Sequence, residues 1–248
     1  MQTWRANEYG QNAAFVSELG SPVLALLSPQ ASEHILDLGC GDGTLALHIQ
    51  QAGSSVVAVD FSESMVAAAQ QKGLNAQVMN GEVLTFESEF DAVFTNAALH
   101  WMLDYKAVIA GVHQVLKPTG RFVGEFGGAG NIQCLLEAIA AVFNENPEFG
   151  EFQSPWYFPS PEDYTKALAE GGFQVDYMEL IPRATPLKAG VQPWLKIFAD
   201  QVIADLTPNQ QQTFLDAVTE KVRPHLYTDN AGWVADYVRL RFVARPIS

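Results

Sequence analysis

The sequence predicts an α/β protein whose mostly parallel, seven-stranded sheet is flanked by helices and followed by a late helical insertion. Residues 34–126 alternate short β-branched runs with helical patterns, which is typical of a parallel sheet built from βαβ units. A glycine-rich turn at residues 39–43 ends the first of these runs. Later in the chain, two helical patterns over residues 193–222 separate two strand-like segments.

Composition limits the class of protein. The 248 residues suit a single domain over 1–248, and a hydrophobic fraction of 48% with a charged fraction of 17% excludes intrinsic disorder. With 28 acidic and 14 basic side chains, the net charge of −14 disfavours nucleic acid and anionic membranes as partners. The sequence shows no apolar stretch long enough to span a bilayer, no secretory signal and only two cysteines. We therefore expect a cytoplasmic monomer or homodimer that acts on a small molecule.

The first half of the chain is expected to contain five strands, over residues 34–38, 56–60, 76–79, 91–95 and 121–126. A helix runs from the glycine turn to residue 51 and Gly53 closes it, while Ser62 caps a second helix that ends at Gly73. Asp104 caps a third helix, whose apolar residues repeat at helical spacing: Val108, Ile109, Val112, Val115 and Leu116.

The second half is less regular. Residues 172–181 and 236–244 have the pattern of strands, which we expect to pair antiparallel at one edge of the sheet. Ser160 starts a helix, and Thr207, followed by a proline, separates the two later helical patterns. The helical insertion over 184–232 is predicted to form a lid or a pocket wall within the same domain.

The turn at residues 39–43 indicates a ligand that approaches the backbone closely. A nicotinamide or flavin dinucleotide is one interpretation. Two details count against it, because the glycines are spaced G-x-G-x-G and not G-x-G-x-x-G, and because Asp37 and Asp42 would repel a pyrophosphate. A ligand with an amine and a sulfonium beside a carboxylate, such as S-adenosylmethionine, fits these charges better. Asp60 ends the second strand, 17 residues after Gly43, where a carboxylate can accept both ribose hydroxyls.

Over residues 33–126 the chain resembles the class I S-adenosylmethionine-dependent methyltransferases. Residues 35–43 look like the first motif of that family, and residues 57–60 look like its second. Residues 90–101 look like the fourth motif, and residues 116–120 resemble the Leu-x-Pro-Gly-Gly turn before the fifth strand. The resemblance implies a Rossmann-like fold in which this segment is the cofactor-binding core, with S-adenosylmethionine as cofactor and S-adenosylhomocysteine as its product.

The resemblance also implies roles for single residues. Asp60 would bind the ribose, Phe61 would lie beside the adenine, Glu82 would take the adenine amino group and the Val83 amide would meet the ring. Glu82 stands where relatives usually have Asp. The segment 1–32 would form an N-terminal cap. The implied cofactor-binding set is Asp37, Gly39, Cys40, Gly41, Asp60, Phe61, Gly81, Glu82, Val83, Asn96 and Ala97.

Within the family, residues 96–101 and the late insertion are similar to the trans-aconitate and malonyl-carrier methyltransferases, both of which methylate carboxylates. This likeness implies methyl transfer to a small-molecule oxygen, either a carboxylate or a hydroxyl. A non-catalytic module that binds S-adenosylmethionine, as a sensor or a partner subunit, is the alternative.

Methyl transfer from a sulfonium is an in-line displacement, which requires alignment and the exclusion of water more than acid or base chemistry. A base is needed only if the acceptor arrives protonated, and His100 is the predicted base for that case. Trp101, Trp156 and Arg239 are predicted to line the substrate site, and Tyr9 to fold over it. No group of side chains has the spacing of metal ligands, so no metal is predicted.

Overall fold

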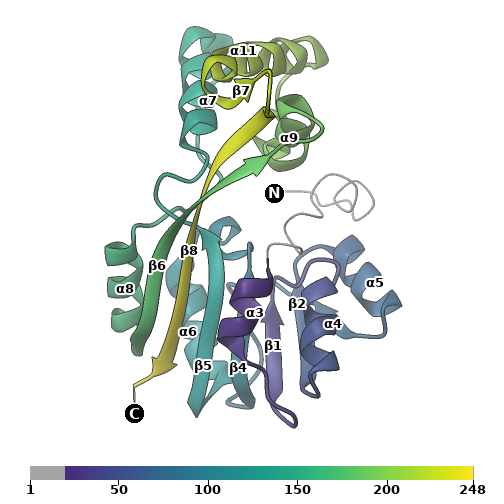
Figure 1. Ribbon diagram of the computed structural model, residues 1–248, viewed down its shortest axis with the longest axis vertical. Helices are drawn as coiled ribbons and strands as arrows, with labels where there is room; N and C mark the ends of the chain where they lie inside the picture. Colours follow the sequence, from purple (N-terminus) through teal and green to yellow (C-terminus); the bar gives the residue numbers. More distant parts are fainter. Residues whose placement is uncertain (1–19, 248) are drawn as a thin grey trace.

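A computed structural model describes residues 20–247 as a mixed sheet with helices on both faces (Figure 1). The strand order is β3-β2-β1-β4-β5-β8-β6, and a short β7 pairs with β8. The first five strands run parallel, and β8 is antiparallel to β5, β6 and β7. The predicted fold is therefore confirmed, with β7 as an eighth strand. The strands are β1 (His34–Leu38), β2 (Ser55–Asp60), β3 (Asn75–Val78), β4 (Phe90–Asn96), β5 (Leu116–Gly127), β6 (Phe173–Pro186), β7 (Tyr227–Thr228) and β8 (Gly232–Pro246).

Alternate residues of the strands bury their side chains on opposite faces of the sheet. One face packs against α3 (Ser21–Leu27), α4 (Thr44–Gln51) and α5 (Glu63–Gln71). The other face packs against α6 (Tyr105–Val115) and α8 (Pro161–Glu170). Four predicted helix starts are correct, because side chains accept hydrogen bonds from the first turn of α5, α6, α8 and α11 (Pro208–Leu226): these are Ser62, Asp104, Ser160 and Thr207.

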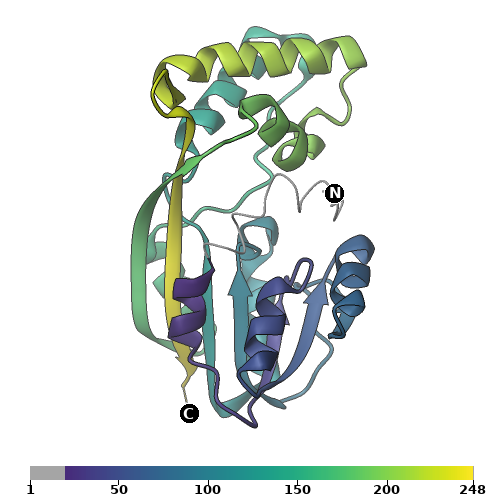
Figure 2. The ribbon, with the colours of Figure 1, turned by 45° about the vertical axis from the view of Figure 1, so that its right-hand side comes forward.

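A separate helical unit lies beyond the carboxyl ends of the parallel strands (Figures 1 and 2). It contains α7 (Gln133–Glu145), α9 (Val191–Phe198), α10 (Asp200–Ile203) and α11, which share one apolar core. Strands β6 and β8, of 14 and 15 residues, continue past their neighbours into this unit. The insertion predicted over 184–232 supplies α9 to α11, whereas α7 comes from an earlier segment for which the sequence analysis assigned no helix. Among residues 20–247, no helix is both long and apolar enough to cross a membrane.

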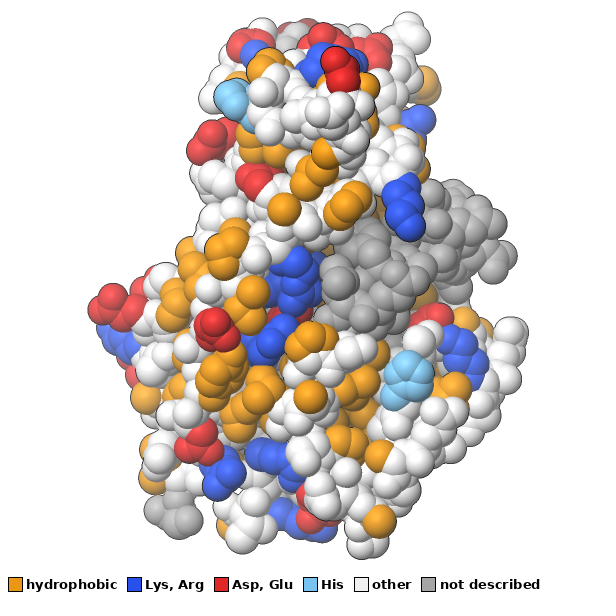
Figure 3. All heavy atoms as spheres, in the orientation of Figure 1, with side chains coloured by type: hydrophobic (Ala, Val, Ile, Leu, Met, Phe, Trp, Pro, Cys, Tyr) orange, Lys and Arg blue, Asp and Glu red, His pale blue; other side chains and the backbone are white. Residues whose placement is uncertain are grey.

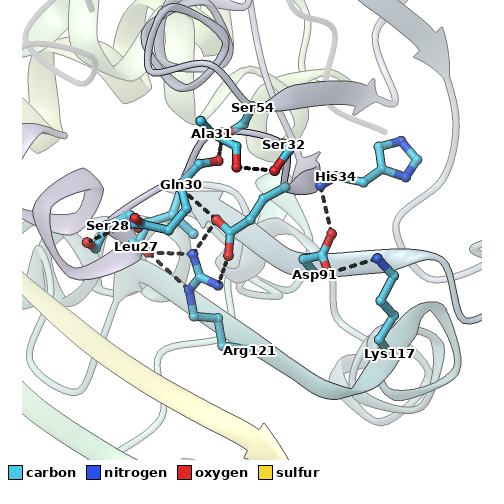
Figure 4. Close-up of polar contacts among 11 residues, drawn as sticks. Leu27, Ser28, Gln30, Ala31, Ser32, His34, Ser54, Asp91, Lys117 and Arg121 are labelled. Carbon is cyan, nitrogen blue, oxygen red and sulfur yellow. Dashed lines mark hydrogen bonds and ion pairs between the residues drawn. The ribbon is translucent and has the colours of Figure 1, made fainter.

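At the amino-terminal ends of the strands, away from the helical unit, a polar cluster joins the beginnings of β1, β4 and β5 (Figure 4). The Arg121 guanidinium donates to both oxygens of Glu33, at 2.6 and 2.8 Å, and to the Leu27 carbonyl at 2.8 and 3.0 Å. Lys117 donates to Asp91 at 2.8 Å. The hydrogen bonds from Arg121 lower the pKa of Glu33. This cluster fixes α3 against the sheet on the side away from the helical unit.

We predict that Arg121→Ala destabilises the protein by about 3 kcal/mol in urea unfolding at neutral pH, because it leaves a largely buried carboxylate without its partner. Arg245→Ala is the control, since Arg245 is an exposed residue of β8 whose ion pair should contribute less than about 0.5 kcal/mol.

The difference between the wild type and Arg121→Ala should depend on pH. The lowered pKa of Glu33 stabilises the folded protein above pH 4.5, and this contribution is lost as the pH falls through the lower folded-state value. Unfolding at pH 7 and pH 3 measures it. Equal losses at both pH values would show that Glu33 and Arg121 are not coupled.

Candidate functional site

The glycine turn after β1 folds back over the end of β2. The backbone amides of Gly39 and Cys40 both donate to the Val59 carbonyl, at 2.8 and 2.9 Å. Gly39, Gly41 and Gly43 have φ angles of 75°, 54° and 78°, a region that side chains disfavour. A Cβ on Gly39 would lie 2.2 Å from the Cβ of Ala98, whereas a Cβ on Gly41 would meet no atom within 4 Å. The turn thus packs tightly against the loop after β4 and leaves open space above Gly41.

The Asp60 carboxylate fixes the other side of this turn. One oxygen accepts from the Gly41 amide and the other from the Ser62 amide, each at 2.9 Å. Burial raises the pKa of Asp60, and the two hydrogen bonds offset only part of that effect. Each carboxylate oxygen keeps a lone pair for a further donor. Asp60 lines both cavities described below, so it is placed to bind a ligand that spans them.

The first cavity has a volume of about 500 Å³ and lies over the ends of β1, β2 and β3. Phe61 and Leu103 line it with 47% and 56% of their surfaces exposed, so two large apolar side chains face the open space. Glu82 also lines it, and one of its carboxylate oxygens accepts from the Asp104 amide at 3.0 Å. A flat aromatic ring with a polar edge would suit these walls.

The second cavity is smaller, about 100 Å³, and lies between the sheet and the helical unit. It shares Gly39, Asp60, Ala98 and Trp101 with the first cavity. Its other lining includes five aromatic side chains, those of Trp156, Phe158, Trp194, Phe198 and Tyr237. Four further polar side chains line it as well: Asn96, His100, Asn131 and Arg239. The two cavities therefore meet at the glycine turn, which suits the transfer of a group from a ligand in one to a ligand in the other.

His100 is buried beside this meeting point. Its Nδ1 atom accepts a hydrogen bond from the Gly127 amide at 3.3 Å, so a neutral ring carries its proton on Nε2. Burial, and then the positive charge of Arg239, lower the pKa of His100 well below its ordinary value of 6.5. The ring packs against Trp101 and Phe158, with centroids 5.4 and 5.7 Å away. At neutral pH His100 is thus uncharged and can donate from Nε2.

Arg239 brings a buried positive charge to the cavity. Only 6% of its surface is exposed, and its guanidinium lies 4.7 Å from the centre of the Tyr237 ring. The Tyr237 hydroxyl accepts from the Trp194 indole of α9 at 2.6 Å. The helical unit thus helps to hold the strand that carries Arg239.

Arg241 lies on the same face of β8 as Arg239, as the alternation of the strand requires. It pairs with the buried carboxylate of Glu125 at 2.6 Å, and Arg183 of β6 pairs with the other oxygen of that carboxylate. Figure 3 shows basic side chains gathered between the sheet and the helical unit. Arg239, which was predicted from the sequence, thus lines the cavity, whereas Arg241 forms an internal ion pair.

Most of the predicted site residues lie together. The cavities are lined by Gly39, Gly41, Asp60, Phe61, Gly81, Glu82, Asn96 and Ala97 from the predicted cofactor set, and by His100, Trp101, Trp156 and Arg239 from the predicted catalytic and substrate residues. Tyr9 lies outside the described residues, as does most of the predicted cap segment 1–32.

Three predicted cofactor residues, Asp37, Cys40 and Val83, line neither cavity. Asp37 is buried, and its Oδ2 atom has no hydrogen-bond partner. The Cys40 thiol donates to the Gly41 carbonyl at 3.4 Å, and burial raises its pKa, so it is not a nucleophile. The Val83 amide, which was predicted to meet the adenine, already donates its hydrogen bond to the Asn80 carbonyl at 2.9 Å.

Sequence reasoning missed several lining residues, mainly Asn131, Ile132, Trp194 and Phe198. Trp194 and Phe198 follow the apolar spacing of α9, but that spacing is the same for a core helix and a cavity wall. Ile132, like Ala97, has a positive φ, 48° and 56° respectively, which no local pattern indicated. Such strained residues gather at functional sites.

The residues present fit S-adenosylmethionine. The buried, unpartnered oxygen of Asp37 lies at the end of β1 where a cationic ligand would compensate it. The space above Gly41 lets a ligand approach the backbone, and the exposed side chains of Phe61 and Leu103 in the first cavity suit an adenine ring. Within residues 20–247, no group of three or more His, Cys, Asp or Glu side chains is arranged to hold a metal ion.

Comparisons with known proteins agree with this geometry. Residues 36–124 match the family described as a methyltransferase domain. An uncharacterised methyltransferase of Schizosaccharomyces pombe is 37% identical over 253 residues, covering 97% of each chain. The trans-aconitate 2-methyltransferase of Shigella dysenteriae is 24% identical, with 99% of each chain covered. A candidate methyltransferase structure from Bacillus halodurans shares the fold, with a TM-score of 0.64, 15% identity, and coverage of 92% of this chain and 98% of that one.

The close approach of Gly39 to Ala98 generates a test of the site's packing. Gly39→Ala should lower the free energy of unfolding by about 2 to 5 kcal/mol, because the new Cβ collides with Ala98 and the backbone is left-handed. Gly41→Ala should lower the free energy of unfolding by only about 1 to 2 kcal/mol, because its backbone is left-handed but the new Cβ meets no neighbour. Adding Ala98→Gly to Gly39→Ala should recover part of the loss, and no recovery in urea unfolding would contradict the contact.

Proposed function

The chain belongs to the class I S-adenosylmethionine-dependent methyltransferase family, and on this premise we propose that it methylates an oxygen of a small-molecule acceptor, with a carboxylate as the favoured group. One observation carries the proposal: a buried arginine and a neutral histidine that can donate a hydrogen bond line the small cavity beside the glycine turn. Both groups suit an acceptor with negatively charged oxygens.

The donor side of the site follows from the first cavity. When bound, S-adenosylmethionine supplies a methyl group made electrophilic by the attached sulfonium. In the proposed arrangement, Asp60 would accept hydrogen bonds from the ribose hydroxyls, Phe61 and Leu103 would cover the adenine, and the turn at Gly39 and Gly41 would hold the amino-acid end. Gly39 and Asp60 line both cavities, so a donor held by them would lie beside the second cavity.

The acceptor side depends on Arg239 and His100. Arg239 would hold one carboxylate of the acceptor through its paired N–H groups. His100 would donate from Nε2, since Nδ1 is already engaged with the Gly127 amide. This assignment replaces the base predicted from the sequence, because the nitrogen able to take a proton is turned to the backbone. A carboxylate is already ionised at neutral pH and needs no base, whereas a hydroxyl does.

The shape of the second cavity supports a small acceptor. Aromatic side chains from the segment before α8, from α9 and from β8 line it, and these would exclude water and hold donor and acceptor in line. A relative named for trans-aconitate, an organic acid, supports the same class of acceptor. Turnover would also distinguish an enzyme from the alternative of a non-catalytic binding module, which the comparisons do not favour.

The first test combines cofactor binding with an acceptor screen. We expect calorimetry to show saturable binding of S-adenosylmethionine and none of NAD, and small carboxylic acids to be methylated in preference to phenols and alcohols. Arg239→Gln should lower kcat/KM for the acid by about 100-fold or more, with the affinity for S-adenosylmethionine nearly unchanged. Arg245→Gln, an exposed residue of the same strand, is the matched control. Equal activity of Arg239→Gln and the control would contradict the proposed acceptor site.

The role of His100 is tested with two substitutions. His100→Gln keeps a donor at a similar position but cannot act as a base, so we expect it to retain turnover within about tenfold, while His100→Ala loses about 10- to 100-fold. Because the pKa of His100 lies well below 6.5, the wild-type kcat, measured with S-adenosylmethionine and acceptor both saturating, should also stay level between pH 6 and 8. A kcat that rises with pH through 6.5, together with a His100→Gln variant as inactive as His100→Ala, would show that His100 acts as a base.

A further inference from the structure

Asp37 is a buried carboxyl group that the proposed reaction does not use directly. It is the last but one residue of β1, where it lies in register with Ala58 of β2 and Phe94 of β4. Only 2% of its surface is exposed, and its Oδ2 atom has no hydrogen-bond partner. An ionised carboxylate without a partner is expensive to bury, so the ligand-free protein favours the neutral acid here.

The charges around Asp37 are negative. Asp60 of β2 is its acidic neighbour, and the carboxyl groups of Asp37 and Asp60 both contribute to the raised pKa of the Cys40 thiol. Asp42 of the same turn is paired with Lys72 at 2.7 Å. The neighbours from β4 are uncharged, and His100, from the helix that follows, is neutral. Burial, and then Asp60, raise the pKa of Asp37 to about 8.

We propose that Asp37 carries a proton in the ligand-free protein and releases it to solvent when the α-ammonium group of S-adenosylmethionine binds at the glycine turn. The ammonium group then provides a positive charge near the ionised carboxylate, which the buried side chain lacks in the ligand-free protein. The inference rests on the proposed function, because it assumes that this ligand binds at this turn. It couples ligand binding to the release of a proton, which the methyl transfer itself does not require.

The linkage makes affinity depend on pH in a defined direction. Below the pKa of Asp37, binding must first remove the proton, so the affinity should fall about tenfold for each pH unit as the pH decreases. The α-amino group of the ligand stays protonated below about pH 7.7 and does not obscure this trend at lower pH. S-adenosylhomocysteine keeps the ammonium group, so it should show the same linkage, whereas 5′-methylthioadenosine lacks the amino-acid end and should show none.

Calorimetry in two buffers of different ionisation enthalpy measures the proton directly, on the full-length wild-type protein. At pH 6.5 we expect S-adenosylhomocysteine to release about one proton per site, and its affinity to rise about tenfold per unit between pH 5.5 and 7. Asp37→Asn should bind it with no proton release and no pH trend. Asp42→Asn is the matched control, an acid of the same turn whose replacement should leave the proton release intact.

Two results would overturn the inference while leaving the proposed function in place. One is wild-type binding of S-adenosylhomocysteine with no dependence of the heat on buffer. The other is a proton release that persists in Asp37→Asn, which would assign the proton to another group. If Asp37→Asn does not fold, the wild-type comparison with 5′-methylthioadenosine still decides the matter, because equal release by both ligands contradicts the proposal. Absence of any binding would overturn the proposed function itself.

Discussion

The functional end of this protein depends on one steric constraint, the contact between the turn after β1 and the loop after β4. Gly39 leaves no room for a side chain against Ala98, and this closeness brings two segments nearly 60 residues apart to one point. The carbonyl of Val59 and the carboxylate of Asp60 fix the turn from the side of β2. Both cavities meet at this point, so a small change in it would misalign the two ligands together.

Charge is distributed in a way that the net value of −14 does not show. The inner acids Glu33 and Glu125 are each matched by arginine, the first by Arg121 and the second by Arg183 and Arg241. Two further ionisable groups lie at the site. Arg239 lines a cavity that also has aromatic walls, and Asp37 is buried with Asp60 as its acidic neighbour. The proposed functions of the two cavities depend on these two residues, Arg239 for the acceptor and Asp37 for the donor.

The sequence predicted the parts that local physics decides. Alternation of β-branched runs located the strands of 34–126, and four capping residues located helix starts, because both signals act over a few residues. The acceptor cavity was predictable only in outline. The proton position on His100 is set by the amide of Gly127, 27 residues away, and the wall of α9 is set by packing across the chain. The helix Gln133–Glu145 was missed although its buried residues Leu135, Ile139 and Val142 repeat at helical spacing, whereas the tertiary contacts that join it to the core of the helical unit have no local signal.

The two long strands β6 and β8 have a consequence for how this enzyme can diversify. They are antiparallel neighbours, so the chain leaves the sheet and returns to it side by side, and α9 to α11 form an excursion between two ends that are already joined by hydrogen bonds. Such an excursion can be lengthened, shortened or exchanged without disturbing the register of any other strand. Because α9 contributes Trp194 and Phe198 to the second cavity, this wall of the cavity can change as a replaceable module, while the strands beside the first cavity keep their register.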